Sequence, residues 1–418
     1  MINKKKQFTT DLIVFLIVFL SGSYVVTNGL VPSFAIIVSW IVLFIAFFLK
    51  IKKIDFRIIV AFVLLSSLMF ISDLVNNEDM LVTFKAIFSF AAICLFANSF
   101  SFTEFTTSFR RVIFPVCFIS IFLFLIFTFY TPMQSFFHDE RGLCNLLIFI
   151  YYPGMKRNFG MFWEPGAFQI FINFALFFEL FDKKPRIHYI IIFTLALITT
   201  FSTTGFIALA VLFIYYLLAK GLKTPKAKIL FLAGVVCFAA FVIIGKDFLF
   251  NDSNGDAVFG KITGFFDNED YKSDRYTSAS IRFFAITKPF EAFFTKPFLG
   301  YGYEGLNLVT QEYTLGMNTC TVIDWFANYG AFFGLVCSIG YFGLGKYYSN
   351  KAGFMIFMSV FLFLVICTEN MVRNPFIITL ILYGYGHNNY VKTIKNRSII
   401  SKKSLLRGKN ESIVYQRF

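Results

Sequence analysis

Charged residues are scarce in this sequence. Asp, Glu, Lys and Arg make up only 15% of its 418 residues, whereas hydrophobic residues make up 57%. Together with a mean hydropathy of +0.71, this composition excludes an ordinary soluble globular protein. The three histidines are far apart and the seven cysteines form no CxxC motif, so we expect no metal site and no disulfide framework. Walker A, Rossmann and GxSxG motifs are also missing, so no nucleotide or other cofactor is expected.

Apolar runs long enough to cross a bilayer dominate the chain. A hydrocarbon core of about 30 Å requires roughly 20 apolar residues in a helix, and counting such runs predicts about twelve membrane-spanning helices. We therefore expect an all-α polytopic membrane protein with a single integral membrane domain over residues 1–418. The expected spans are 9–28, 32–49, 57–73, 81–99, 112–131, 164–181, 188–202, 204–219, 229–246, 320–345, 353–368 and 376–391.

The net charge of +14 follows the expected topology. Lys and Arg gather in alternate connections, from Lys4–Lys6 to a basic tail at 391–418, whereas the connection at 74–80 contains acids and no Lys or Arg. Because positively charged connections stay in the cytoplasm, both termini are predicted to be cytoplasmic. Orientation and attraction to anionic membrane lipid account for the basic charge, and no nucleic-acid partner is expected.

Two long connections fall on the opposite, outer side. The first covers 132–163, and its apolar centre predicts a segment that lies on or dips into the membrane interface. The larger one covers 247–319 and is expected to be partly helical, because its second half is amphipathic. Pro289 and Pro297 are expected to break any helix there.

Residues 157–168, RNFGMFWEPGAF, run from the first outer loop into an apolar span. One interpretation is a helix start, with Pro165 in the first turn, Glu164 near the positive end of the helix dipole and Trp163 at the interface. The other is a functional site, because charges at such a depth are costly and usually mark a site or a buried pair.

Arginines that the topology does not require also lie on the outer side. A guanidinium group makes planar, bidentate contacts with carboxylate or phosphate, although an arginine at the interface also reaches lipid headgroups. Asp324 falls just inside an expected span and therefore needs a partner or water. The outer arginines are Arg141, Arg157, Arg275, Arg282 and Arg373.

Three blocks of the chain together resemble the O-antigen polymerase/ligase superfamily. Its members carry an R-x-x-G-x-F-x-E-P-G-like stretch at the start of a span, an S-x-T-G turn between two spans, and an Arg upstream of P-x-x-G-x-G in the large outer loop. The residues that match are Arg157, Gly160, Phe162, Glu164, Pro165 and Gly166, then Ser202, Thr204 and Gly205, then Arg282, Pro297, Gly300 and Gly302.

The resemblance implies a glycosyltransferase of the bacterial cytoplasmic membrane. Its donor and acceptor would be undecaprenyl-diphosphate-linked oligosaccharides, and a chain-length regulator is a possible partner. Arg157 and Arg282 would stabilise the diphosphate leaving group, and Glu164, with Asp324 behind it, would accept the proton of the attacking hydroxyl. The expected substrate-binding residues are Arg141, Gly160, Trp163, Arg275, Gly300, Gly302 and Asn318.

The resemblance leaves the choice of acceptor open. Ligases of this superfamily typically carry a His at the end of the large loop, where this sequence has Thr319 flanked by Asn318. The missing His favours a polymerase of O-antigen, capsule or exopolysaccharide over a ligase. A transporter or flippase of lipid-linked glycans is the alternative that is not an enzyme. It is disfavoured by the long loops and by the few charges within spans, of which Lys85 is the clearest.

Overall fold

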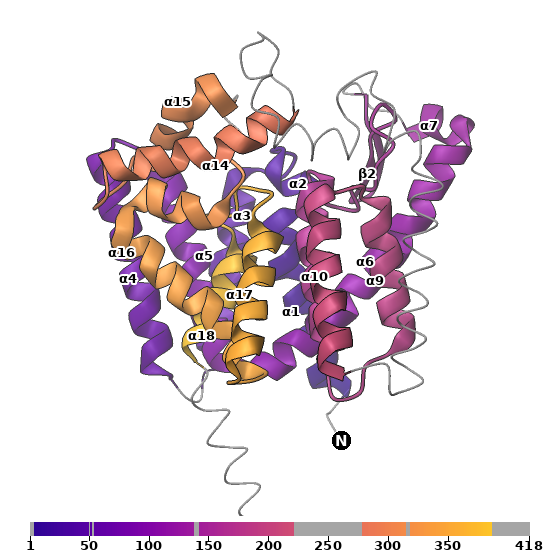
Figure 1. The fold of residues 1–418 in the computed structure, drawn as a ribbon, viewed down its shortest axis with the longest axis horizontal. Coiled ribbons are helices and arrows are strands. Elements are labelled where there is room, and N and C mark those ends of the chain that lie inside the picture. The colour runs from indigo at the N-terminus through magenta and orange to yellow at the C-terminus, as the bar shows by residue number, and fades with distance from the viewer. Residues whose placement is uncertain are drawn as a thin grey trace, which may run out of the picture.

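The computed structural model describes residues 4–49, 51, 54–137, 142–220, 278–314 and 318–386. In these ranges the chain is mostly helical, with one antiparallel pair of strands, β1 (Cys144–Leu146) and β2 (Phe149–Tyr151) (Figure 1). The helices are α1 (Lys4–Gly22), α2 (Tyr24–Thr27), α3 (Ser33–Phe48), α4 (Phe56–Val75), α5 (Met80–Ser99), α6 (Phe102–Phe129), α7 (Thr131–Phe137), α8 (Pro165–Leu180), α9 (Ile187–Thr199), α10 (Thr203–Lys220), α14 (Ser278–Thr295), α15 (Tyr303–Thr314), α16 (Thr321–Gly343), the 3₁₀ helix η3 (Leu344–Tyr347), α17 (Ala352–Ile366) and α18 (Pro375–Tyr385).

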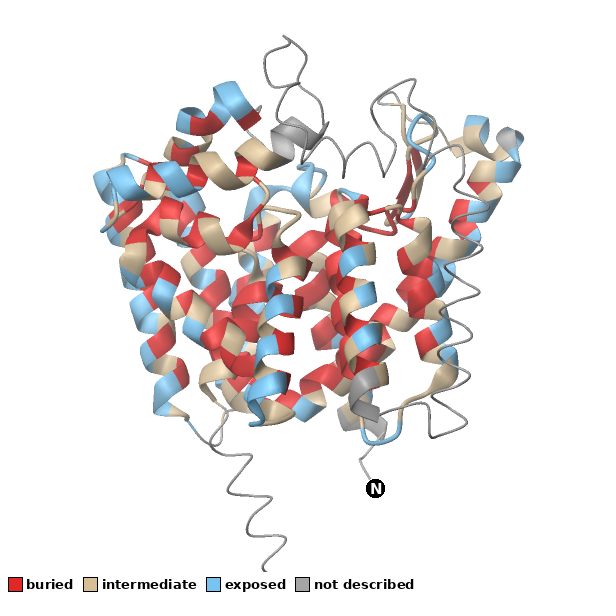
Figure 2. Ribbon diagram, in the orientation of Figure 1, coloured by how far each residue is buried: buried red, intermediate tan, exposed pale blue. Residues whose placement is uncertain are grey.

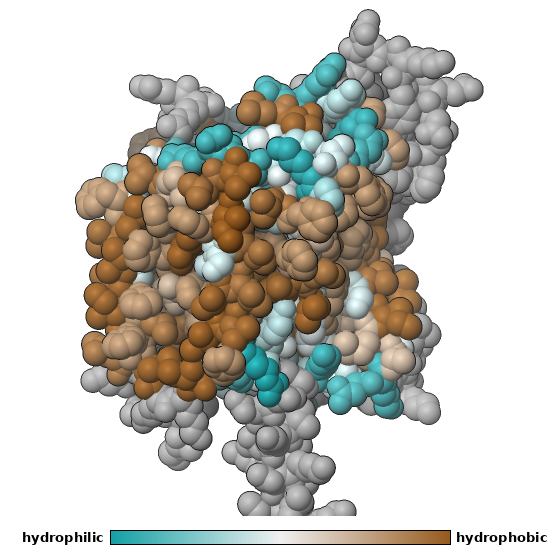
Figure 3. All heavy atoms as spheres, turned by 90° about the vertical axis from the view of Figure 1, so that its left-hand side faces the viewer, coloured by the Kyte–Doolittle hydropathy of each residue, from teal (hydrophilic) through white to brown (hydrophobic). Residues whose placement is uncertain are grey.

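The apolar helices confirm a helical membrane protein. Within the described residues, α4, α5, α6 and the stretch formed by α16 and η3 are long and apolar enough to cross a membrane, and α1, α3, α8, α9, α10, α17 and α18 are shorter apolar helices. Figure 3 shows apolar side chains across the middle of one face, with hydrophilic side chains towards both ends. The expected span at 229–246 and the tail at 391–418 lie outside the described residues, so the number of twelve spans stays a prediction.

One expected span begins ten residues too late. We expected a helix from residue 112, whereas α6 starts at Phe102. Ser101 and Glu104 form a capping box at this start, in which each side chain accepts from the backbone N–H of the other. Arg110, which lies before the expected start of this span, is instead buried inside α6 and forms an ion pair of 3.0 Å with Glu179.

Figure 2 shows that burial is concentrated in the middle of the bundle. Its centre is α8, whose side chains are almost all buried and which packs against α6, α9, α10 and α17. Stacked phenylalanine rings such as Phe109 and Phe376, 5.0 Å apart, fill the space between the helices. The segment that leads into α8 is therefore joined to a helix that is buried along nearly its whole length.

The apolar centre of the first outer loop is a β-hairpin rather than an isolated apolar segment. Cys144 pairs with Tyr151, and Leu147 makes the turn with a positive φ of 56°. Tyr151 stacks on Phe127 of α6 at 5.5 Å. The apolar residues of this loop are thus explained by packing on the end of α6.

Helices α14 and α15 and the hairpin lie at one end of the bundle, which we call the upper end, and the N-terminus lies at the opposite end (Figure 1). Our expectation that Pro289 breaks the helix is wrong, because α14 continues through it to Thr295. Pro297 does lie beyond the end of the helix, as expected. A proline inside a helix removes one backbone hydrogen bond but does not always end the helix.

The segment Pro297–Gly302 packs against a break in α16. Gly330 has φ 81° and ψ 178°, which interrupts the helix, and the carbonyl of Asn328 accepts the N–H of Gly302 at 2.9 Å. A Cβ atom on Gly300 would lie 2.3 Å from the oxygen of Asn328. The loop therefore satisfies backbone groups that the broken helix leaves open.

Candidate functional site

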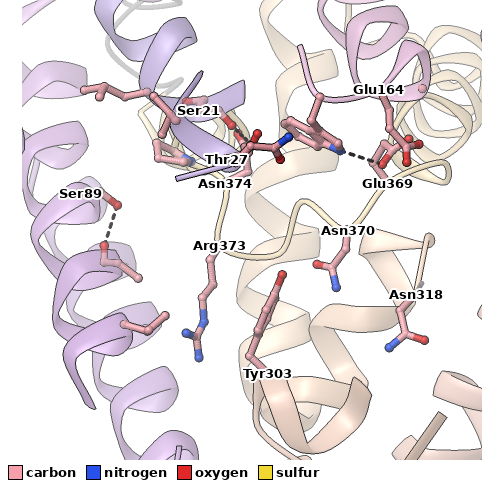
Figure 4. Close-up of a pocket in the computed structure, with 18 of the residues that line it drawn as sticks. Ser21, Thr27, Ser89, Glu164, Tyr303, Asn318, Glu369, Asn370, Arg373 and Asn374 are labelled. Carbon is pink, nitrogen blue, oxygen red and sulfur yellow. Dashed lines mark hydrogen bonds between the residues drawn. The ribbon is translucent and has the colours of Figure 1, made fainter. Parts of the chain in front are cut away.

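A cavity of about 830 Å³ lies at the upper end of the bundle (Figure 4). Its walls come from α1 to α3, α5, the segment before α8, α15 and the connection between α17 and α18. The charged residues that line it are Lys85, Arg157, Glu164, Glu369 and Arg373. Segments that are far apart in the sequence therefore bring cations and carboxylates into one space.

Arg157 joins two of the motifs that we recognised separately. Its Nε donates to the carbonyl of Thr200 at 2.9 Å and its Nη2 donates to the carbonyl of Phe201 at 3.1 Å. Phe201 has φ 49°, a left-handed conformation that is unusual for a bulky residue. This strained turn directs both carbonyls at the end of α9 towards Arg157, and Ser202 beside it also lines the cavity.

The EPG motif forms the start of α8, with Glu164 as the N-cap residue and Pro165 in the first turn. The interpretation as a helix start is therefore confirmed. The same residues line the cavity, and a functional role for them stays a prediction. The Glu164 carboxylate is exposed and has no hydrogen bond or ion pair within the described residues. Gly166 leaves room for the second carboxylate of the cavity, since a Cβ atom there would lie 2.1 Å from Oε1 of Glu369.

Glu369 lies on the same side of the cavity as Glu164 (Figure 4). Its Oε2 accepts the indole N–H of Trp163 at 3.3 Å, and its backbone carbonyl accepts the hydroxyl of Thr321 at 2.5 Å. Trp163, which we predicted to contact substrate, thus has a partner for its polar edge and leaves its ring on the cavity wall.

Arg373 is anchored from behind the cavity. Its Nη2 donates to both carboxylate oxygens of the fully buried Asp73, at 2.8 and 2.7 Å, and Nε donates to the hydroxyl of Tyr329. The guanidinium group lies 4.8 Å from the ring centre of Tyr303. Burial disfavours the charged form, but Tyr329 and Asp73 outweigh burial and raise the pKa of Arg373 further. The residue therefore stays cationic.

Asn318 lines the cavity but uses its amide within the fold. It donates to Oδ1 of Asn307 and accepts from the hydroxyl of Thr310, both at 3.0 Å. These bonds tie α15 to the start of α16. A direct contact between Asn318 and a substrate stays a prediction.

Four other predicted site residues do not line the cavity. Asp324 is fully buried, and neither of its oxygens has a hydrogen-bond partner within the described residues. Gly160 has φ 60°, and a Cβ atom there would lie 2.8 Å from Phe168. Gly300 and Gly302 form the turn on the broken α16. Positive φ angles and close contacts place these glycines in turns of the chain itself, and a role in substrate binding stays a prediction.

Three predicted arginines are not placed at the site. Arg141 and Arg275 lie outside the described residues. The backbone of Arg282 belongs to α14, and its side chain lies outside the described part of the chain. The expected pairing of Arg157 with Arg282 therefore stays a prediction.

The sequence analysis missed the contribution of residues 368–375, TENMVRNP. Thr368, Glu369, Asn370, Arg373 and Asn374 all line the cavity. The signal was a short polar run with both an acid and a base between two apolar spans. The sequence identifies Arg373 only as an arginine that the topology does not require, and Lys85 only as a charge within a span.

The described residues contain no group of three or more His, Cys, Asp or Glu side chains placed to hold a metal ion. The cysteines among them form no disulfide with one another, and nearly all are buried.

These observations define a helical membrane protein with a charged cavity at one end of its bundle. Residues 188–319 match a family model described as O-antigen ligase, which confirms the resemblance to the O-antigen polymerase/ligase superfamily. The match includes the S-x-T-G turn, α14 and α15, whereas Arg157 and α8 lie before it. A search of curated proteins finds no match to the chain.

Proposed function

We propose that the protein is a polysaccharide polymerase of the bacterial cytoplasmic membrane, which joins undecaprenyl-diphosphate-linked repeat units on the outer face. The observation that carries this proposal is the cavity, because it combines the unpartnered carboxylate of Glu164 with the cations Lys85, Arg157 and Arg373. The family match supports lipid-linked glycans as the substrate class. The orientation, with both termini cytoplasmic, follows from the distribution of basic residues.

The proposed reaction needs a base and a stabilised leaving group. A hydroxyl of the acceptor attacks the anomeric carbon of the donor, a new C–O bond forms, and the bond between this carbon and the diphosphate breaks. The electron pair leaves with the diphosphate, whose charge the cations of the cavity stabilise. The hydroxyl proton passes to Glu164. The donor carries its own leaving group, so no nucleotide sugar is consumed.

A ligase that transfers finished glycan to a different acceptor is the second candidate. The description of the matching family model, O-antigen ligase, favours it. It would use the same donor and the same cavity. Against it stands Thr319, at the place where ligases of the superfamily typically carry a histidine, and Thr319 lines the cavity.

Purified protein in detergent, incubated with synthetic undecaprenyl-diphosphate-linked repeat units, tests the proposal. We expect a ladder of products that differ by one repeat unit, formed without nucleotide sugar. Substrate that stays at its original size would overturn the polymerase. Transfer that occurs only after a separate lipid or glycan acceptor is added would establish the ligase in its place.

Glu164→Gln tests the proposed base. The variant keeps the size of the side chain and removes the charge, so we expect kcat to fall by about 10²–10⁴-fold with normal insertion. Glu291→Gln on α14 is the matched control, because Glu291 is exposed and, among the described residues, forms its ion pair with the nearby Lys288. Equal rates in the two variants would exclude Glu164 as the base.

A further inference from the structure

Lys85 is a cation inside a membrane-spanning helix. It lies about one and a half turns after the start of α5, which is among the helices long enough to cross a membrane. A charge at the centre of a span costs about 2.5–3.5 kcal/mol on insertion scales, and ionisable residues within spans usually face a partner or a cavity. Within the described residues the Lys85 side chain has neither a hydrogen bond nor an ion pair. It is partly buried and lines the cavity.

The other two cations of the cavity are already bonded within the protein. Arg373 donates to Asp73, and Arg157 donates to backbone carbonyls. The two carboxylates of the cavity lie close to the start of α8. Glu164 is the N-cap residue of this helix, and Glu369, from the connection before α18, accepts the indole N–H of Trp163. No carboxylate among the described residues therefore pairs with Lys85. An anionic ligand in the cavity would supply the missing counter-charge.

The cavity wall around Lys85 is apolar. Val82 and Ala86 flank it on α5, and Ile36 and Trp40 face the same space from α3, which packs directly on α5. From Val82 to Ser89 the helix rises by about 10 Å, so this wall continues below the polar rim. The opposite side of the cavity carries Glu164, Asn318 and the amide-rich connection before α18 (Figure 4). Lys85 therefore stands where the apolar wall meets the polar wall.

We infer that Lys85 binds the diphosphate of a prenyl-diphosphate-linked substrate and that the wall formed by Ile36, Trp40 and Val82 takes the isoprenoid units next to it. This inference rests on the proposed function and divides the cavity in two. The lipid end lies between α3 and α5. The glycan end lies towards α8 and α15, where Glu164 faces the bond that is formed.

Binding of prenyl diphosphates to the purified full-length protein tests the inference. Farnesyl diphosphate and inorganic diphosphate serve as probes, and calorimetry measures their Kd. We expect farnesyl diphosphate to bind at least tenfold more tightly than inorganic diphosphate. Lys85→Met should weaken both probes at least tenfold, whereas Lys85→Arg should retain most of the affinity. Val82→Asn should weaken only the farnesyl probe. Lys351→Met, which changes an exposed lysine at the other end of the bundle, is the matched control.

The stability of the variant separates lost binding from lost folding. Because Lys85→Met removes an unpaired charge from a partly buried position, its melting temperature without ligand should equal or exceed that of the wild type. Unchanged affinity of Lys85→Met for both probes would overturn the inference. Equally tight binding of phosphatidylglycerol at Lys85 would also overturn it and assign the position to a lipid headgroup.

The two proposals fail in different ways. If the wild type forms a glycan ladder and Lys85→Met forms it at the same rate, the proposed function is supported and the role of Lys85 is refuted. If prenyl diphosphate binds through Lys85 but no glycan is transferred, the lipid-binding site is supported and the proposed glycan transfer is refuted.

Discussion

The buried pair of Asp73 and Arg373 offers a sharp test of how the cavity is held. Asp73 is fully buried in α4, and besides Arg373 it accepts the hydroxyl of Thr83 at 2.7 Å. Arg373 stays charged, because its neighbours raise its pKa. Asp73→Asn therefore leaves a guanidinium group, whose side chain is only 12% exposed, without a counter-charge.

The size of the effect follows from this burial. Removing one partner of a buried ion pair costs about 3–5 kcal/mol, because the other charge stays behind without compensation. We expect Asp73→Asn and Arg373→Met each to lower the free energy of unfolding by an amount in this range. The double variant should lose less than the sum of the two, by about 0.5–3 kcal/mol, because neither charge remains buried alone.

Denaturant unfolding in detergent, followed by the fluorescence of the tryptophans, measures all four proteins of this cycle. Additive losses would refute the coupling. If the free energy of unfolding of each single variant lies within about 0.5 kcal/mol of the wild type, as is usual for surface substitutions, the claim that a buried ion pair stabilises the folded state is refuted. Glycan transfer should be lost in both single variants, since the connection that carries Glu369 is anchored by Arg373.

Three further outcomes follow from the same structure. Gly302→Ala should destabilise the protein by roughly 1–3 kcal/mol, because the residue has φ 77° and a Cβ atom would lie 2.3 Å from Glu78; a melting temperature equal to that of the wild type would contradict this. Arg110→Met should destabilise by about 1.5–3 kcal/mol, since the fully buried Glu179 loses one arginine partner but keeps Arg186 at 2.7 Å, and unfolding in denaturant measures the loss. Trp163→Phe should keep the fold but lower kcat, because the indole N–H no longer holds its carboxylate partner; an unchanged kcat in the ladder assay would show that this bond is not needed.

Composition and motifs predicted a large part of this molecule. Apolar runs identified the helices because a bilayer leaves the backbone few alternatives. The EPG motif predicted the start of α8, because proline favours the first position of a helix. This helix start also lines the cavity. The superfamily resemblance rested on short motifs, and the family match supports it.

Other features depended on contacts that no local pattern contains. From the sequence, Gly300 and Gly302 could let backbone approach a substrate or form tight turns, and their contacts with α16 place them in a turn. Glu369 had no motif of its own, and only the packing of its connection on Gly166 brought it to the cavity. Pro289 lies inside α14, although a proline in a helix interior usually ends or kinks the helix. In each case tertiary packing decided what local propensity left open.

The contact between the loop at 297–302 and the break in α16 also bears on how the chain is assembled. The loop precedes α16 in the sequence, so the amide groups that will satisfy the open carbonyls of Ala327 and Asn328 are synthesised first. A span with unsatisfied backbone is costly in lipid, and here the segment that meets this cost is already synthesised when the span is made. Biogenesis of α16 is therefore tied to the segment before it, and shortening that segment should impair membrane insertion rather than only the chemistry of the site.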